Sequence, residues 1–100
     1  MKIFNAFASQ IDLNYFTSMK SDAILFHTAL SNVYKDSKFY IIQSGDCYYI
    51  CGEVYVTKET IKDHKYQIDY LAYYYECKKY EVDVFFDHFN NPTFIYRNVV

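Results

Sequence analysis

Residues 39–56 read FYIIQSGDCYYICGEVYV, in which two apolar runs are separated by the polar turn Ser44-Gly45-Asp46. Both runs are rich in aromatic and β-branched side chains, which favour strands. Serine, glycine and aspartate are residue types that tight turns use. This stretch therefore predicts a β-hairpin with strands at 39–43 and 47–56.

The segment before this hairpin has the spacing of an amphipathic helix over residues 22–35. Its apolar side chains recur every three or four positions, at Ala23, Phe26, Ala29, Leu30, Val33 and Tyr34. Ser21 or Asp22 suits the cap, and Lys35 suits the last turn, where a cation complements the helix dipole.

The segment after the hairpin predicts a second helix over residues 58–79, which contain no glycine or proline. Thr57 is the expected cap, and Lys78 with Lys79 would close the last turn. One face gathers residues that can pack on a sheet: Ile61, His64, Ile68, Leu71, Ala72 and Tyr75. We interpret His64 as a core histidine with a hydrogen-bond partner, because no ligand or catalytic pattern surrounds it.

The chain ends with a second predicted hairpin, in which the turn 90–93 joins strands at 81–87 and 94–99. At the other end, residues 2–7 suggest a strand. Residues 8–20 fit a helix or a strand, and we leave their conformation open. Gly52 interrupts the second strand of the first hairpin and suggests a bulge or bend there.

The predicted order is β-α-β-β-α-β-β, which is an α+β fold built on a small antiparallel sheet with two helices. Its first six elements match the ferredoxin-like arrangement, and the last strand is then a C-terminal addition. A chain of 100 residues is the size of one domain, covering 1–100, and is long enough to bury a core.

The second predicted helix carries tyrosines on the side where a surface helix ordinarily carries charge. Tyr66, Tyr70, Tyr73 and Cys77 step by four, three and four residues along one ridge, with Tyr74 beside it. A tyrosine ring supplies contact area while its hydroxyl stays hydrated, which suits a face that is sometimes covered. We therefore expect a docking face for another protein.

Three alternatives fit the same tyrosine pattern. The helix could pair with its copy in a homodimer, or the tyrosines could lie in the core of the monomer. The third alternative is that Tyr73–Tyr75 belong to a long strand, since aromatic residues favour strands.

Acidic residues give a second partner-binding prediction, at Glu81, Asp83 and Asp87. Glu81 and Asp83 alternate with apolar residues, so a strand would place both carboxylates on one face, about 7 Å apart. Such a strip could meet a basic surface on a partner protein. A solvated polar face explains the same residues without any function.

Nucleic-acid binding is a further alternative, because cations stand beside aromatic residues in Lys38-Phe39-Tyr40, Lys78-Lys79-Tyr80 and Tyr96-Arg97. The net charge of −2, the pI near 5.8 and the single arginine argue against it. Direct binding of nucleic acid is therefore the weaker expectation.

Composition excludes several other classes of protein. The chain is 52% hydrophobic and 22% aromatic, which is not the composition of a disordered protein. Two glycines are too few for a glycine-rich phosphate loop. No apolar run has the roughly 18 residues of a membrane span, and the N-terminus lacks the apolar stretch of a secretory signal. We expect a cytoplasmic protein.

The cysteines and histidines give no recognisable chemistry. Cys47, Cys51 and Cys77 are an odd number for a disulfide framework, and their spacing matches no zinc module. No cysteine stands in a nucleophile signature with a histidine. We expect a non-enzymatic protein without a metal site or a cofactor, and reduced cysteines.

The chain is rich in phenylalanine, tyrosine, lysine, asparagine and isoleucine, the amino acids of AT-rich codons. Small AT-rich reading frames are frequent in phages, plasmids and low-GC bacteria. By this association we expect a phage or mobile-element inhibitor of a host defence system, of the anti-CRISPR or anti-restriction type. It would cover a working surface of a host factor or nucleoprotein complex. The alternatives are a nucleic-acid-binding accessory module and a homodimeric structural subunit.

Overall fold

The structure is a computed structural model that describes residues 9–99, without the side chains of 81–85 and 94–99. Within this range the elements are β1 (Ser9–Thr17), α1 (Lys20–Val33), β2 (Phe39–Ser44), β3 (Cys47–Val56), α2 (Ile61–Tyr74), β4 (Lys78–Phe86) and β5 (Pro92–Val99). Their order is the predicted one. The first strand lies in the segment that the sequence left open, and the strand expected at 2–7 lies outside the described residues.

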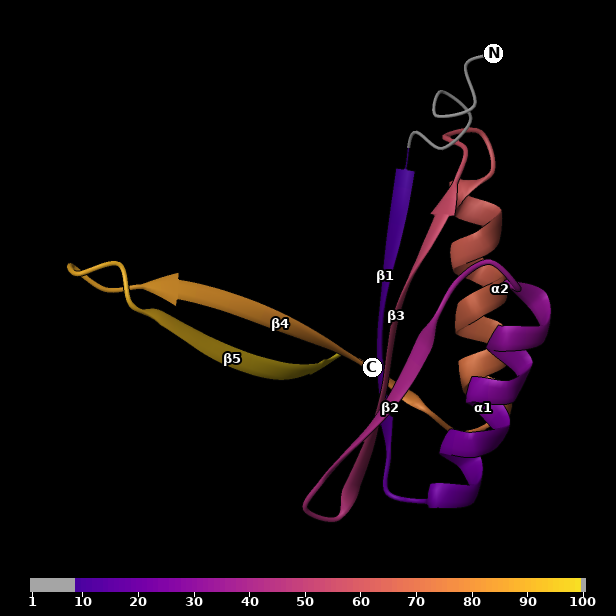
Figure 1. Cartoon of the computed structure of the whole chain (residues 1–100), viewed down its shortest axis with the longest axis horizontal. Helices are drawn as coiled ribbons and strands as arrows, with labels where there is room; N and C mark the ends of the chain where they lie inside the picture. Colours follow the sequence, from indigo (N-terminus) through magenta and orange to yellow (C-terminus); the bar gives the residue numbers. More distant parts are fainter. Residues whose placement is uncertain (1–8, 100) are drawn as a thin grey trace.

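The strands form one sheet with the order β2-β3-β1-β4-β5, in which all neighbours are antiparallel. The first four strands have the ferredoxin-like order, because each helix connects two strands that flank a third. β5 adds a strand beyond this arrangement. Both helices lie on one side of the sheet (Figure 1), so the predicted α+β fold is confirmed.

β4 pairs with β1 only at its beginning, where Lys78 and Lys79 lie opposite Phe16 and Tyr15. Beyond this point β4 pairs with β5, from Lys79↔Val99 to Phe86↔Pro92. The β4–β5 hairpin projects from the sheet as an arm that points away from the helices (Figure 1).

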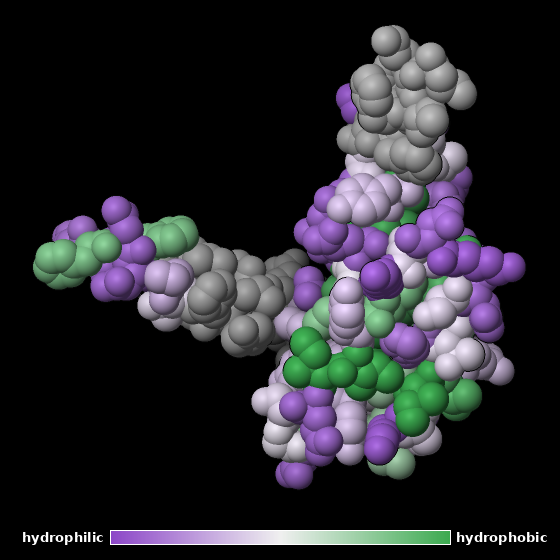
Figure 2. All heavy atoms as spheres, viewed as in Figure 1, coloured by the Kyte–Doolittle hydropathy of each residue, from purple (hydrophilic) through white to green (hydrophobic). Residues whose placement is uncertain are grey.

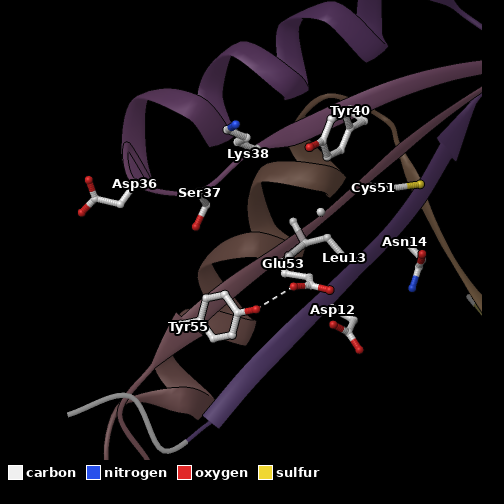
Figure 3. Close-up of a pocket in the computed structure, with 11 residues that line it drawn as sticks. Asp12, Leu13, Asn14, Asp36, Ser37, Lys38, Tyr40, Cys51, Glu53 and Tyr55 are labelled. Carbon is white, nitrogen blue, oxygen red and sulfur yellow. Dashed lines mark hydrogen bonds between the residues drawn. The ribbon is translucent and has the colours of Figure 1, made fainter. Parts of the chain in front are cut away.

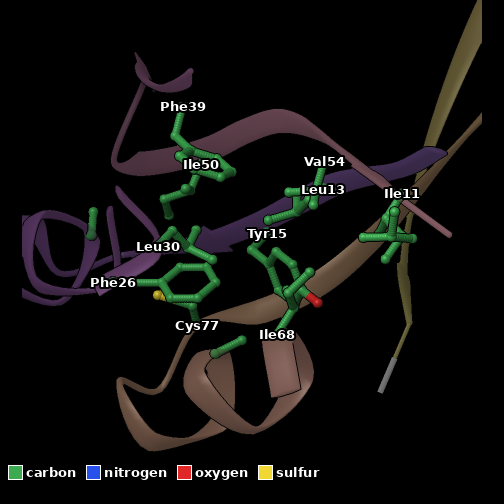
Figure 4. Close-up of a cluster of buried hydrophobic side chains, with 13 residues drawn as sticks. Ile11, Leu13, Tyr15, Phe26, Leu30, Phe39, Ile50, Val54, Ile68 and Cys77 are labelled. Carbon is green, nitrogen blue, oxygen red and sulfur yellow. The ribbon is translucent and has the colours of Figure 1, made fainter. Parts of the chain in front are cut away.

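The hydrophobic core lies between the sheet and the two helices (Figure 4). Alternate residues of β1 face it, because side chains of a strand point to opposite sides in turn. The largest side chains that are almost completely buried are Phe26, Leu13, Leu30, Ile50, Ile68 and Val54. This core fixes both helices on the sheet and thereby fixes which of their faces remains outside.

The β2–β3 hairpin turns through Gly45 and Asp46, with Ser44 paired to Cys47. Gly45 has a φ of +60°, a conformation that favours glycine. The bulge predicted at Gly52 is wrong, because the ladder of β3 with β1 keeps a constant register through this residue, and the ladder with β2 begins at it. Glycine at this position allows the Phe39 ring to pack closely against the backbone of β3, because a Cβ there would lie 2.6 Å from that ring.

α1 differs from its prediction at both ends. It begins at Lys20 rather than at residue 22, and its N-cap residue Met19 makes no side-chain capping bond. Neither Ser21 nor Asp22 is the cap; both lie inside the first turn. The helix ends at Val33, so Lys35 lies beyond its last turn.

α2 is shorter than the predicted 58–79. Thr57 does not cap it, because the helix begins at Ile61 and the Thr57 hydroxyl pairs with that of Thr60 at 2.8 Å. At the other end, the N–H of Cys77 donates to the carbonyl of Ala72 and that of Glu76 to Tyr73. These bonds, with Glu76 at a φ of +58°, form a Schellman motif that ends the helix. Lys78 and Lys79 therefore begin β4.

Candidate functional site

The inward face of α2 is the one that its spacing predicts. Ile68 and Ala72 are buried in the core, and Ile61, Leu71 and Tyr75 pack against it while partly exposed. Since these contacts fix the rotation of the helix about its axis, they also fix its outward face.

That outward face exposes four tyrosines, which we call the tyrosine face: Tyr66, Tyr70, Tyr73 and Tyr74. Their side chains are 76%, 57%, 81% and 66% exposed, respectively. All four lie on α2, so burial in the monomer's core and membership of a strand are both wrong as alternatives. Exposure and helical placement are confirmed, whereas docking of a partner stays a prediction.

Cys77 does not lie on the ridge, contrary to its spacing. The helix ends before it, and the Schellman turn directs the residue into the core, where it is 6% exposed. Burial, and secondarily the charge of Asp22, raises the pKa of the Cys77 thiol to about 12.

The tyrosine hydroxyls are available to a partner. In the described part of the chain, none of the four forms a hydrogen bond to another residue. Among the ring contacts of the described residues, only one involves the tyrosine face, an edge-to-face packing of Tyr74 on Tyr75 with centroids 4.9 Å apart. The face thus offers ring surface and free donors on a helix whose other side packs on the core.

α2 also makes a polar contact with Tyr34, the residue that follows α1. The Tyr34 hydroxyl lies 2.8 Å from Nδ1 of His64, and the two ring centroids are 5.5 Å apart. This contact confirms the hydrogen-bond partner predicted for His64, but the residue is only partly buried and does not belong to the core. Burial raises the pKa of Tyr34, so its hydroxyl stays protonated at neutral pH.

Asp69 ties one flank of the tyrosine face to the sheet. Its carboxylate lies 3.3 Å from the ammonium of Lys79 and accepts a hydrogen bond from the Tyr15 hydroxyl. Burial of Tyr15, and then the neighbouring Asp69, raises the pKa of the phenol. Neither contact uses a side chain of the tyrosine face.

The residues of the predicted acidic strip belong to the β4–β5 hairpin, and the shared face predicted for Glu81 and Asp83 stays a prediction. Glu81 and Asp83 pair in register with Arg97 and Ile95, but their side chains lie outside the described residues. Asp87 is not in the strand, which ends at Phe86. It lies in the turn between β4 and β5, and the arm that these strands form points away from α2 (Figure 1).

Asp87 organises the turn of the arm. One carboxylate oxygen accepts the backbone N–H groups of Phe89 and Asn91, at 2.8 and 2.9 Å, and the other accepts the Asn91 side chain. These hydrogen bonds lower the pKa of Asp87, with those from Asn91 and Phe89 as the main causes. The local geometry therefore assigns Asp87 a structural role.

The lysine–aromatic patches are only partly exposed in the described residues. Lys38 and Tyr40 are exposed, and the side chains of Tyr96 and Arg97 lie outside the described residues. Phe39 is buried in the core, and Lys79 is paired with Asp69. Tyr80 is 7% exposed and packs with Phe16 and Tyr49, at centroid distances of 6.2 and 5.3 Å. This aromatic cluster joins residues that are far apart in sequence, so no local pattern could have predicted it.

A polar pocket of about 760 Å³ opens beside β1 and β3, near the segment that precedes β2 (Figure 3). Asp12, Asp36 and Glu53 line it, and the Tyr55 hydroxyl donates to Glu53 at 2.7 Å. This bond and the two nearby carboxylates, Glu53 and Asp12, raise the pKa of Tyr55. Within the described residues no group of His, Cys, Asp and Glu could hold a metal ion.

Comparisons with protein-family models, with curated proteins and with solved structures found no match. Among the described helices, none has the length and apolar character needed to cross a membrane. The candidate site thus rests on the geometry of the tyrosine face.

Proposed function

We propose that this chain is a non-enzymatic protein-binding module that docks through the tyrosine face of α2. The observation that carries the proposal is the exposure of Tyr66, Tyr70, Tyr73 and Tyr74 along a helix whose other side is held in the core. Surfaces with clustered tyrosines are enriched in interfaces and in their energetic hot spots.

The chemistry of the face defines the partner that fits it. A tyrosine ring buries about 150–250 Å² when it is fully covered, so four of them supply a substantial apolar contact. Each hydroxyl can donate a hydrogen bond that the monomer leaves unused. The partner should therefore present an apolar surface with hydrogen-bond acceptors, such as carbonyls or carboxylates, at its rim.

The target class in this proposal is a host defence factor or nucleoprotein complex, which the module inhibits by covering a working surface. The source is then a phage or mobile element, and the module is of the anti-CRISPR or anti-restriction type. Support for this class comes from the small size of the chain and its AT-rich amino-acid usage.

The experiment is affinity capture from the lysate of an AT-rich bacterial host, followed by mass spectrometry and measurement of Kd for the captured protein. We expect Tyr70→Ala and Tyr73→Glu each to cost about 2 kcal/mol, roughly thirtyfold in Kd. Tyr55→Ala is the matched control, because Tyr55 is 51% exposed but lies on β3.

Equal binding by the wild type and both α2 variants would overturn the proposed face. Inhibition is tested separately, by adding the purified chain to the captured complex and measuring the activity of that complex. If the captured complex keeps its activity when it is saturated with the chain, the chain is a binding module and the proposed inhibition is rejected.

A further inference from the structure

β2 lies at a free edge of the sheet. In the order β2-β3-β1-β4-β5 it pairs with β3 on one side, and no strand within residues 9–99 pairs with its other side. Such an edge presents a row of backbone N–H and C=O groups that can accept a further strand.

This edge lacks the features that usually prevent pairing. Phe39–Ser44 contains no charged residue and no proline, and its ladder with β3 has no bulge. Tyr40, Ile41 and Ile42 are 57%, 36% and 54% exposed. A hydrophobic patch covers β2 and the neighbouring α1 on the face seen in Figure 2.

The charges that flank this strand are placed symmetrically about its centre. Lys38 precedes Ile42 by four residues and Asp46 follows it by four. An antiparallel pairing of two identical strands centred on Ile42 therefore sets each Lys38 opposite the Asp46 of the other copy. Both residues are exposed, and no ion pair in the described part of the chain uses either of them.

We propose that β2 pairs antiparallel with β2 of a second copy, about a two-fold axis that passes through Ile42. The axis is perpendicular to the sheet, so the two sheets become continuous and both helical layers lie on the same side. A two-fold interface is closed, because each free β2 edge is used by the other, and assembly through this edge stops at two copies.

The charge pattern favours a second copy over an unrelated strand. Residues 39–45 carry no charge, so the pairing of two copies brings no like charges together. Lys38 and Asp46 then supply one attractive pair at each end of the interface, which also fixes the register. The docking face on α2 takes no part in this pairing and stays free for its own partner.

The test is sedimentation velocity of the full chain over a range of protein concentrations. We expect dimer formation that increases with concentration. Ile42→Lys places two ammonium groups at the axis and should weaken dimerisation at least tenfold. Tyr70→Ala, on α2, is the control and should leave dimerisation unchanged.

Charge reversal tests the register. Lys38→Asp alone and Asp46→Lys alone each oppose like charges and should weaken the dimer severalfold. The double variant, which carries both changes, restores opposite charges and should return dimerisation to the wild-type level. Circular dichroism of each variant checks that the fold is retained.

Three results would overturn the proposal. One is a wild type that stays monomeric at all concentrations, which would leave the edge to a different partner strand. Another is a dimer that survives Ile42→Lys, or is lost with Tyr70→Ala, which would place the contact elsewhere. The third is a double charge variant that fails to recover. Loss of the dimer with Tyr70→Ala would place the self-contact on the tyrosine face, whereas the other results do not bear on capture of a partner by that face.

Discussion

Phe39 and Gly52 are paired across the β2–β3 ladder, and the ring of Phe39 fills the space that a side chain at Gly52 would need. A Cβ at position 52 would lie 2.6 Å from Cδ1 of Phe39 and 2.8 Å from the carbonyl oxygen of Lys38. Both distances are shorter than a normal contact. Glycine at this position therefore allows Phe39 to enter the core at the start of β2.

Gly52→Ala should consequently reduce the free energy of unfolding, by about 1–3 kcal/mol, the range of overpacking substitutions. Chemical denaturation measures this loss. The cost should shrink when Gly52→Ala is made together with Phe39→Ala, because the displaced ring is then absent. An equal cost in both backgrounds would contradict the role of the Phe39 ring.

Tyr15→Phe tests the bond between the sheet and the flank of the tyrosine face. It keeps the ring that packs edge-to-face on Phe26, with centroids 5.1 Å apart, but removes the hydroxyl that donates to Asp69. We expect a loss of about 1 kcal/mol at neutral pH, the usual contribution of a hydrogen bond. Chemical denaturation of the wild type and the variant gives the difference.

The same pair predicts a dependence on alkaline pH. The folded state raises the pKa of Tyr15 above its usual value near 10, so the folded chain holds the phenol proton more tightly than the unfolded chain. Stability from this group is fully present below pH 10 and is lost as the pH rises further. The wild type should therefore lose stability above pH 10 more steeply than Tyr15→Phe. An equal loss of unfolding free energy with pH in the wild type and in Tyr15→Phe would contradict the raised pKa of Tyr15.

The thiol of Cys77 should be unreactive in the folded chain, because its pKa is raised to about 12 by burial. Cys47 and Cys51 are partly exposed, so they provide internal controls. At pH 8 we expect iodoacetamide to modify Cys77 at least a hundredfold more slowly than in denaturant. Mass spectrometry of peptides locates the label. Labelling of folded Cys77 at the rate of Cys51 would place it outside the core.

Local signals explain why the β2–β3 hairpin and the tyrosine face could be predicted. The turn at Gly45 and Asp46 lies between two apolar runs, so the hairpin is specified by adjacent residues. The outward position of Tyr70 and Tyr73 follows from helical periodicity relative to Ile68 and Ala72. Both inferences use only residues that lie close together in the sequence.

The end of α2 could not be predicted in this way. Helices commonly end at a glycine with a positive φ, but here Glu76 adopts that conformation. No breaker separates Tyr75 from Lys78, so periodicity alone extends the helix and places Cys77 on its surface. α2 ends before Cys77 because this residue is buried in the core, where its thiol contacts the backbone carbonyl of Asp22 in α1.

β1 was ambiguous for a related reason. Ile11 and Tyr15 are four residues apart, as on a helix, while Ile11, Leu13 and Tyr15 alternate, as on a strand. The partner strand β3, which settles the conformation, lies more than thirty residues away in the sequence. Tertiary pairing therefore determines a segment whose local pattern fits both states.

Acidic pH should open the turn of the β4–β5 arm, because the Asp87 carboxylate holds this turn. The pKa of Asp87 is lowered because the carboxylate accepts N–H groups of Phe89 and Asn91 in the turn. The turn is therefore stabilised above the usual carboxyl pKa near 3.9, and this stabilisation is lost as the pH falls through the lowered value. NMR should show the amide resonances of Phe89 and Asn91 moving together at that pH. In Asp87→Ala both amides should already have the shifts of the open turn at pH 7, and wild-type shifts in this variant would contradict the role of the carboxylate.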